Sequence, residues 1–187
     1  MNKNIVITFI IGIIVGGFAW EGMRPRSDVA DSALAINRHF IEQMIPHHDD
    51  AITMAKLALE RATKQEIKNL ASAIIEGQTN ENDQMQAWYK QWFGVDVPVV
   101  NTGMMGHGQM HGGMMSGDTD FSNLETSQDF DRDFIREMIP HHQMAVMMAS
   151  MMLGSTERPE MKKLGQDIIE AQTREIEQMR EWYSQWK

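Results

Sequence analysis

Phe40-Ile-Glu-Gln-Met-Ile-Pro-His-His48 is matched 94 residues later by Phe134-Ile-Arg-Glu-Met-Ile-Pro-His-His142. The correspondence continues without a gap, so that 26 of 54 positions are identical between residues 39–92 and 133–186. A repeated unit of this length indicates duplicated supersecondary structure with pseudo-symmetry between the copies. We therefore expect any binding site to lie where the two halves meet.

Apolar residues in the first copy recur at spacings of three and four, which predicts helices with one buried face. The first helix is expected over about 28–60, with a kink or a restart at Pro46. Thr63-Lys-Gln-Glu66 has the form of a capping box and predicts the start of a second helix. That helix should run to about Trp92 and end at Gly94.

The second copy predicts the same pair of helices, over about 127–153 and 159–187, with Pro159 in the first turn of the latter. Two amphipathic hairpins bury each other best as an all-α, antiparallel four-helix bundle. We expect residues 28–187 to form one domain, made of a first hairpin repeat (28–92), a flexible Met/Gly/His-rich linker (93–121) and a second hairpin repeat (122–187).

The composition is unusually rich in methionine, which has two possible explanations. The chain has 18 Met and no Cys, and its net charge of −9 includes no basic stripe, which argues against nucleic-acid binding. Methionine fills cores, but its thioether also binds cuprous copper. Composition alone leaves both explanations of the Met content open.

The N-terminus predicts export. A short cationic start precedes the mostly apolar segment Ile5–Trp20, so residues 1–22 are expected to be a signal peptide or a membrane anchor. The rest of the protein is then expected in the periplasm or otherwise outside the cytoplasm, secreted or anchored.

Each repeat carries a methionine and two histidines in ligand spacing. Met44 lies three and four residues before His47 and His48, on a helical face shared with either. If the repeats pack about a pseudo-twofold axis, Met44, His48, Met138 and His142 could converge at the bundle centre. The alternative for each His is a hydrogen-bonded core residue. The full candidate ligand set of the bundle is Met44, His47, His48, Met54, Met138, His141, His142 and Met148.

The linker offers further ligands and almost no residue that could form a core, so metal capture explains its methionines better than packing does. Its candidate ligands are Met104, Met105, His107, Met110, His111, Met114 and Met115.

Polar residues on the inner faces of the second and fourth helices are expected to orient the imidazoles from outside the ligand shell, as carboxylates often do. These residues are Gln78, Glu81, Gln172 and Glu175. Direct ligation of the metal and a buried hydrogen-bond network are the alternatives. The chain has no Glu-x-x-His pair of di-iron bundles, no His-Glu-x-x-His motif and no phosphate loop, so no catalytic residue is predicted.

With both copies of the Met-Ile-Pro-His-His motif and the Met/Gly-rich link, residues 35–187 resemble the bacterial domain-of-unknown-function family 305. The resemblance implies a ferritin-like four-helix fold and, for some members, periplasmic copper binding and resistance. The family usually has Asp three residues before the motif Phe. The second copy keeps it as Asp131, expected to cap or ligate, whereas the first has Asn37; His39 is unique to the first copy.

The predicted function is an extracytoplasmic copper- or silver-binding protein with a chaperone or tolerance role. Cuprous copper is the expected ion, silver is an alternative, and zinc and iron fit the methionines less well. Its partners would be the metal ion, the membrane if residues 1–22 are retained, and copper-export machinery. A ferritin-like metal oxidoreductase and a metal-free partner-binding module of the cell envelope are the alternatives.

Overall fold

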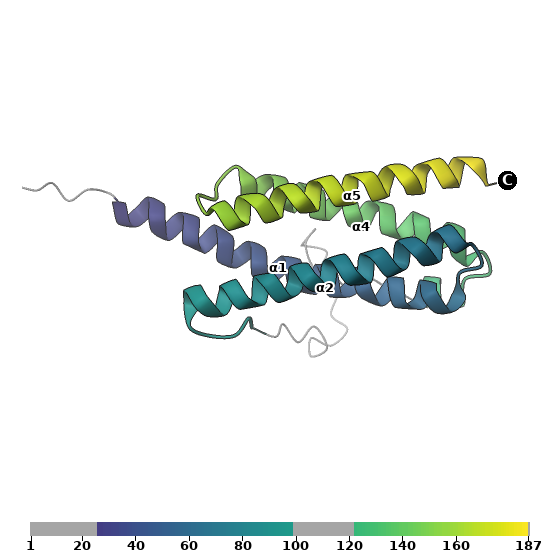
Figure 1. The fold of residues 1–187 in the computed structure, drawn as a ribbon, viewed down its shortest axis with the longest axis horizontal. Coiled ribbons are helices and arrows are strands. Elements are labelled where there is room, and N and C mark those ends of the chain that lie inside the picture. The colour runs from purple at the N-terminus through teal and green to yellow at the C-terminus, as the bar shows by residue number, and fades with distance from the viewer. Residues whose placement is uncertain (1–25, 99–121, 187) are drawn as a thin grey trace, which may run out of the picture.

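The computed structural model describes residues 26–98 and 122–186, and in these ranges the protein is helical without strands. Helices α1 (Arg26–Arg61) and α2 (Gln65–Phe93) form one hairpin, and α4 (Phe130–Leu153) and α5 (Pro159–Gln185) form the other (Figure 1). A five-residue helix, α3 (Ser122–Thr126), precedes α4. The predicted helical bundle is thus confirmed, while the closer likeness to ferritin-type bundles stays a prediction.

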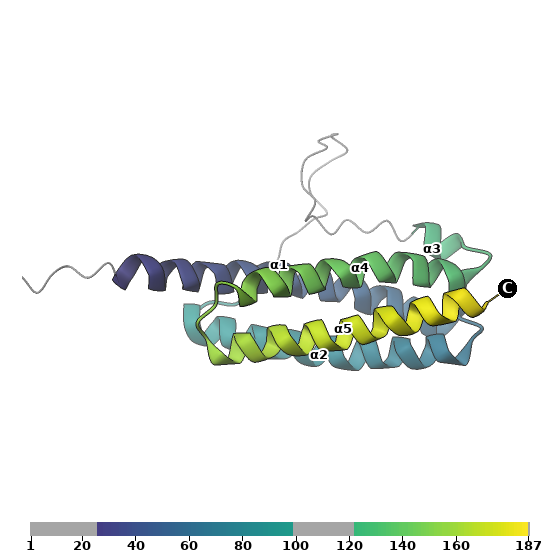
Figure 2. The same cartoon turned by 90° about the horizontal axis from the view of Figure 1, so that it is seen from above.

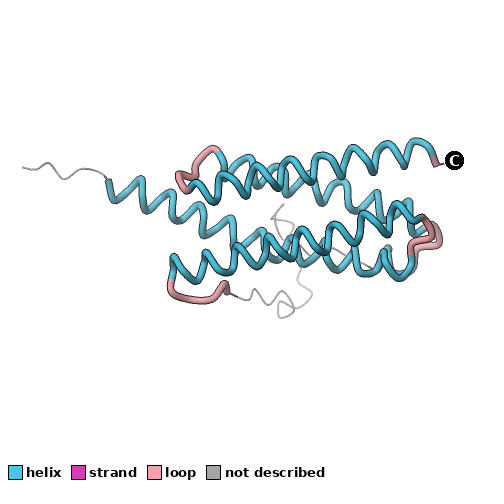
Figure 3. Tube along the Cα trace, in the orientation of Figure 1, coloured by secondary structure: helices cyan, strands magenta, loops and turns pink. Residues whose placement is uncertain are grey.

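The two hairpins lie side by side, and their four long helices follow one common axis. Short loops join the two helices of each hairpin at the ends of the bundle (Figures 2 and 3). Contact between the hairpins is made chiefly by α1 against α4. These are the helices that carry the two Met-Ile-Pro-His-His motifs, so the fold brings the duplicated motifs together.

Two predicted helix boundaries are confirmed. Gly94 ends α2 in the left-handed region, with φ of 71°, and its N–H donates to the Lys90 carbonyl at 3.0 Å. A glycine adopts this conformation without a Cβ clash. Pro159 occupies the first turn of α5, where its missing N–H costs nothing. Pro46 lies inside the continuous α1, so the predicted restart of the helix there is wrong.

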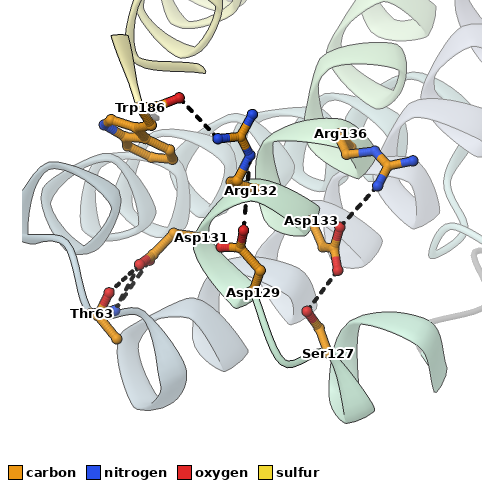
Figure 4. Close-up of polar contacts among 8 residues, drawn as sticks. All are labelled: Thr63, Ser127, Asp129, Asp131, Arg132, Asp133, Arg136 and Trp186. Atoms are coloured by element: carbon orange, nitrogen blue, oxygen red, sulfur yellow. Dashed lines mark hydrogen bonds and ion pairs between the residues drawn. The ribbon is translucent and has the colours of Figure 1, made fainter. Parts of the chain in front are cut away.

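Helix α2 begins at Gln65, as the sequence Thr63-Lys-Gln-Glu66 predicts, but the capping box itself does not form. The start of α2 is capped from the other hairpin, by the buried Asp131 of α4 (Figure 4). Its carboxylate accepts the Thr63 N–H at 3.1 Å, the Thr63 hydroxyl and the Lys64 N–H at 3.5 Å. A carboxylate at a helix start satisfies otherwise unpaired N–H groups and suits the helix dipole. The cap therefore ties the hairpins together.

Further polar contacts surround this cap. Arg132 donates to the Trp186 carbonyl at 2.9 Å, and Ser127 donates to the Asp133 carboxylate at 2.6 Å (Figure 4). Arg61, at the end of α1, donates to the carbonyls of Leu124 and Ser127 at 2.6 and 2.7 Å. We call this end of the bundle the capped end.

Buried apolar residues form two clusters, and each cluster draws on both hairpins. One contains the C-terminal part of α1 and the N-terminal part of α4, including Met54 and Met138. The other contains the preceding part of α1 and the following part of α4, including Met44 and Met148. The paired histidines lie between these stretches in the sequence of both helices, so the motif forms a polar layer between two apolar clusters.

Among the described residues, no helix is long and apolar enough to cross a bilayer. Two predictions fall outside these residues, namely the export segment 1–22 and the ligands of the linker. The linker ligands concerned are Met104, Met105, His107, Met110, His111, Met114 and Met115.

Candidate metal centre

His47 and His141 meet where α1 crosses α4. Their ring centroids lie 3.8 Å apart, with the ring planes inclined by 35°. Within each helix, the neighbouring imidazoles are separated by 6.4 Å (His47 to His48) and 6.3 Å (His141 to His142). The fold thus gathers four imidazoles from the two motifs into one layer.

The other histidine of each motif binds a carboxylate of its own hairpin. His48 Nε2 lies 2.8 Å from Glu81 Oε2, and His142 Nε2 lies 2.7 Å from Glu175 Oε2. Both histidine side chains are fully buried, whereas the two carboxylates keep 17% and 19% of their surface exposed. The halves repeat the same pair in the same geometry, as a pseudo-twofold axis requires.

This pairing decides which imidazole nitrogen remains available. An ionised carboxylate can only accept a hydrogen bond, so in a neutral ring Nε2 carries the hydrogen and Nδ1 carries a lone pair. The Nδ1 atoms of His48 and His142 are buried and have no protein partner. Buried nitrogen atoms without partners are uncommon in folded proteins and call for an explanation.

More unpartnered atoms belong to the same polar layer. His47 Nδ1 and both ring nitrogens of His141 are buried without a hydrogen bond. Gln78 Oε1 and both amide atoms of Gln172 are in the same state, and these residues lie one helical turn before the two glutamates. Several buried ring nitrogens and amide atoms of the layer therefore have no hydrogen-bond partner among the residues of the protein.

Burial keeps the central imidazoles neutral. The pKa of His47 falls from 6.5 to about 3, first because the ring is buried and then because His48 and His142 lie close. The pKa of His141 falls to about 2, again because of burial first and then because of His47 and the other two imidazoles. Neutral imidazole is the form that binds metal ions.

The predicted methionine ligands surround the layer and do not all converge on one point. Met44 and Met138 are both fully buried, but they belong to different apolar clusters. Because α1 and α4 run antiparallel, residues that precede the histidines in each helix lie on opposite sides of the layer. Met54 and Met148 are buried farther along the two helices.

No three His, Asp or Glu side chains within residues 26–98 and 122–186 are grouped as a metal-ion cage. The imidazoles are arranged instead as a facing pair and two carboxylate-bound rings. Asp131 lies eleven residues before His142, about 16 Å along α4. It caps α2 and takes no part in this layer.

Residues 37–183 match the family described as "Domain of unknown function (DUF305)". The chain belongs to this family. The match spans both helical hairpins and therefore the whole histidine layer of this DUF305 protein.

Solved structures similar to this DUF305 protein include CopM. CopM in the Cu(II)-bound form is 53% identical, with a TM-score of 0.72 over 81% of this chain and 97% of that chain. CopM in the Cu(I)-bound form is 49% identical, with a TM-score of 0.69 over 80% and 96% of the two chains. CopM has also been solved in Ag-bound and apo forms.

More distant relatives share the fold or part of the sequence. A DUF305 fragment from Deinococcus radiodurans is 28% identical, with a TM-score of 0.65 over 81% of this chain and 97% of that chain. The uncharacterized protein L153 of Acanthamoeba polyphaga mimivirus is 41% identical over 49 residues. That match covers 26% of this chain and 32% of the viral protein.

One buried polar pair was not singled out from the sequence. Asn82, which is 5% exposed, donates to the Asp49 carboxylate at 2.9 Å, one residue beyond both His48 and Glu81. The corresponding residue of the second repeat is Ile176, which is buried in an apolar cluster. The sequence signal for this pair is Asn82 itself, a polar residue on the buried face of α2. A search for residues shared by the two repeats overlooks it, because the second repeat has Ile176 at this position.

Proposed function

We propose that this protein binds monovalent copper or silver in the histidine layer and carries or sequesters the ion. The observation that supports this proposal is the state of His48 and His142. Each ring is held by a carboxylate at Nε2 and leaves a buried Nδ1 without a partner. Metal-bound histidines commonly donate their second N–H to a carboxylate, which orients the ring and makes the other nitrogen a better ligand.

The surroundings of the layer favour a soft, weakly hydrated ion. The apolar clusters on both sides contribute fully buried thioethers from Met44, Met54 and Met138. Thioether and imidazole ligands suit Cu(I), while ions such as Mg²⁺ and Ca²⁺ demand oxygen ligands. CopM, which is 49–53% identical to this chain, is known in Cu(I)-, Cu(II)- and Ag-bound forms, which supports the same cargo here.

The roles of individual residues follow from their positions. His48 and His142 are the candidate primary ligands, and Glu81 and Glu175 are positioning residues that hold their rings. His47 and His141 remain neutral at physiological pH because their pKa values are lowered, so neither of these two rings repels a cation that enters the layer. Gln78 and Gln172 supply polar atoms that could reorient when an ion is present.

We also propose that the bundle works outside the cytoplasm, because residues 1–22 have the pattern of an export signal or anchor. Fractionation of cells that express the full chain would test this. Recovery of the bundle from the cytosol would contradict it.

The deciding experiment is a titration of the full chain with Cu(I) in competition with a chromophoric chelator. We expect the double variant His48→Gln/His142→Gln to lose the Cu(I) ion that the histidine layer binds. Glu81→Gln/Glu175→Gln should weaken binding by roughly 10–100-fold, because positioning groups of metal-bound histidines have effects of that size. Glu76→Gln/Glu170→Gln, which alters two exposed carboxylates at equivalent positions of α2 and α5, is the matched control.

Thermal melting recorded in parallel locates the ion. An ion bound by the native bundle raises the melting temperature, because a ligand that prefers the folded state stabilises it. Unchanged affinity in a folded His48→Gln/His142→Gln variant would refute the histidine site. Absence of any Cu(I) binding would favour the partner-binding alternative, and catalytic turnover of a bound metal would favour the oxidoreductase.

A further inference from the structure

A second feature of chemical interest lies away from the histidine layer. A groove of about 390 Å³ opens between the N-terminal part of α1 and the C-terminal part of α4. It lies at the end of the bundle opposite the capped end, since it includes Ser155 of the α4–α5 loop. Its lining residues are Ala35, Ile36, His39, Phe40, Gln43, Met148, Met151, Met152 and Ser155.

Four of these residues carry the ligand types that bind soft metal ions. Met148, Met151 and Met152 are spaced i, i+3 and i+4, so they share one face of α4. His39 faces the same groove from α1. Met151 is 61% exposed, and its thioether is therefore open to ions in solution, whereas Met152 is 2% exposed and forms the floor.

Three of these four ligand residues are not repeated in the other hairpin. The residues equivalent to His39, Met151 and Met152 in the other repeat are Asp133, Leu57 and Ala58. The capped end therefore has no thioether at the positions equivalent to Met151 and Met152. The ligand set belongs to one end of the molecule only.

Helix α5 makes room for one of the methionines. A Cβ atom at Gly165 would lie 2.7 Å from the Met152 methyl group and 3.0 Å from Leu153. At the capped end, Ala71 is equivalent to Gly165 and Ala58 is equivalent to Met152. The side chain on α2 is therefore larger there by one methyl group, and the side chain on α1 is smaller. The larger Met152 is therefore matched by the loss of a methyl group on α5, which fixes this thioether beneath the groove.

We propose that this groove is a second binding site for Cu(I) or Ag(I), with His39 and the thioethers of Met148, Met151 and Met152 as its ligands. Thioether and imidazole together are a ligand set that suits these ions. Met148 lies seven residues from His141, about 10 Å along α4, so the groove is separate from the histidine layer. The site does not depend on the proposed function of that layer.

The test uses the full chain labelled with ¹³C at the methionine methyl groups and titrated with silver nitrate in chloride-free buffer. Single Met→Leu variants assign the signals. We expect the methyl signals of Met148, Met151 and Met152 to shift with added Ag(I). The shifts should persist in His48→Gln/His142→Gln, which separates failure of the groove from failure of the histidine layer.

Stoichiometry provides a second measurement. The variant His39→Gln/Met148→Leu/Met151→Leu keeps the histidine layer and should bind one Ag(I) fewer than the wild type. Met147→Leu is the matched control, because Met147 is 41% exposed on the same helix but does not line the groove. Equal stoichiometry in the groove variant and the control, or groove methyl signals that ignore Ag(I), would overturn the proposal.

Discussion

The two His–Glu pairs at the middle of this bundle are the same in both halves, whereas the two ends of the bundle differ. At the centre, His48 with Glu81 and His142 with Glu175 repeat one geometry to within 0.1 Å, from 2.8 to 2.7 Å. At the capped end, a buried carboxylate joins the hairpins. At the other end a groove opens. A duplicated chain keeps its two copies alike where both serve one site and lets them diverge where each serves its own end.

The divergence is clearest at Asp131 and its counterpart Asn37. Asp131 accepts hydrogen bonds from Thr63 and Lys64 across the hairpin boundary. Asn37 is equally buried, at 1% exposed, but its Oδ1 has no partner. Asp131 therefore joins the hairpins at the capped end by charged hydrogen bonds, whereas Asn37 Oδ1 makes no such bond at the end where the groove opens.

The largest predicted effect is a pH-dependent loss of stability that arises from His47 and His141 at the centre of the bundle. Because the folded pKa values of His47 and His141 lie below 6.5, the unfolded chain binds more protons once the pH falls below about 6.5. Stability is thus fully present above that pH and is lost as the pH falls toward 3. For the metal-free protein we expect a loss of about 3–4 kcal/mol between pH 7 and pH 5, measured by urea unfolding.

Symmetry sharpens this prediction. His47→Gln alone and His141→Gln alone should each remove about half of the pH dependence, because each ring contributes one shifted proton. If the two single variants remove markedly unequal parts of the pH dependence, then the two rings are not equivalent despite their similar positions. An unchanged profile in the double variant would assign the pH dependence to other groups.

The next effect separates the two ends. Asp131→Ala leaves the N–H groups of Thr63 and Lys64 without their acceptor, so we expect a loss of about 3 kcal/mol and a melting temperature lower by roughly 6–12 °C. Asn37→Ala removes an oxygen that has no partner and should cost at most about 1 kcal/mol. Equal losses would mean that the capped end is no stronger than the other.

A smaller effect tests how the groove end accommodates Met152. Gly165→Ala should destabilise by about 1 kcal/mol, since the new methyl group meets Met152 and the gain in helix propensity offsets only part of that clash. Adding Met152→Ala reproduces the Ala58–Ala71 pair of the other end and should recover part of the loss in a double-mutant cycle. Additive losses would contradict the proposed packing match.

Gly77→Ala is the matched control for that substitution. No atom lies within 4 Å of a Cβ at Gly77, and the second repeat already has Ala171 at the equivalent position. We expect this variant to be stabilised by about 0.5–1 kcal/mol, measured by urea unfolding, because alanine is the better helix former.

The smallest effect is expected at the aromatic ends of α2 and α5. Lys64 lies 4.6 Å from the Trp186 ring centroid, and its repeat counterpart Arg158 lies 3.9 Å from that of Trp92. Each of these partly exposed cations is expected to contribute about 0.5–1 kcal/mol. Lys64→Gln and Arg158→Gln should therefore lower stability by similar small amounts, and a loss confined to one variant would reveal a further difference between the ends.

The long helices could be predicted because their signals are local. Apolar spacing, Gly94 and Pro159 act within one or two turns, and the observed boundaries agree with them to within a few residues. The capping of α2 could not be predicted in this way, since Asp131 is 68 residues from Thr63 and carries no periodic signal. Helix α3 was missed because its five residues span little more than one turn.

The candidate site was predictable to a similar degree. Repetition of the motif pointed to the histidines, and the inner stripe pointed to Glu81 and Glu175 as the residues beside them. The placement of Met44 and Met138 on opposite sides of the layer depends on the antiparallel crossing of α1 and α4. Sequence spacing within one helix does not contain that information.

The two apolar clusters have a consequence for the origin of this fold. Each cluster is completed by residues from both hairpins, so neither hairpin can bury its own apolar face. A single hairpin would expose its apolar face to water until it packed against a second hairpin. An identical copy, related by a true twofold axis, would offer a matching apolar face. A gene that encoded one repeat could therefore have produced a working dimer before duplication joined the two halves into one chain.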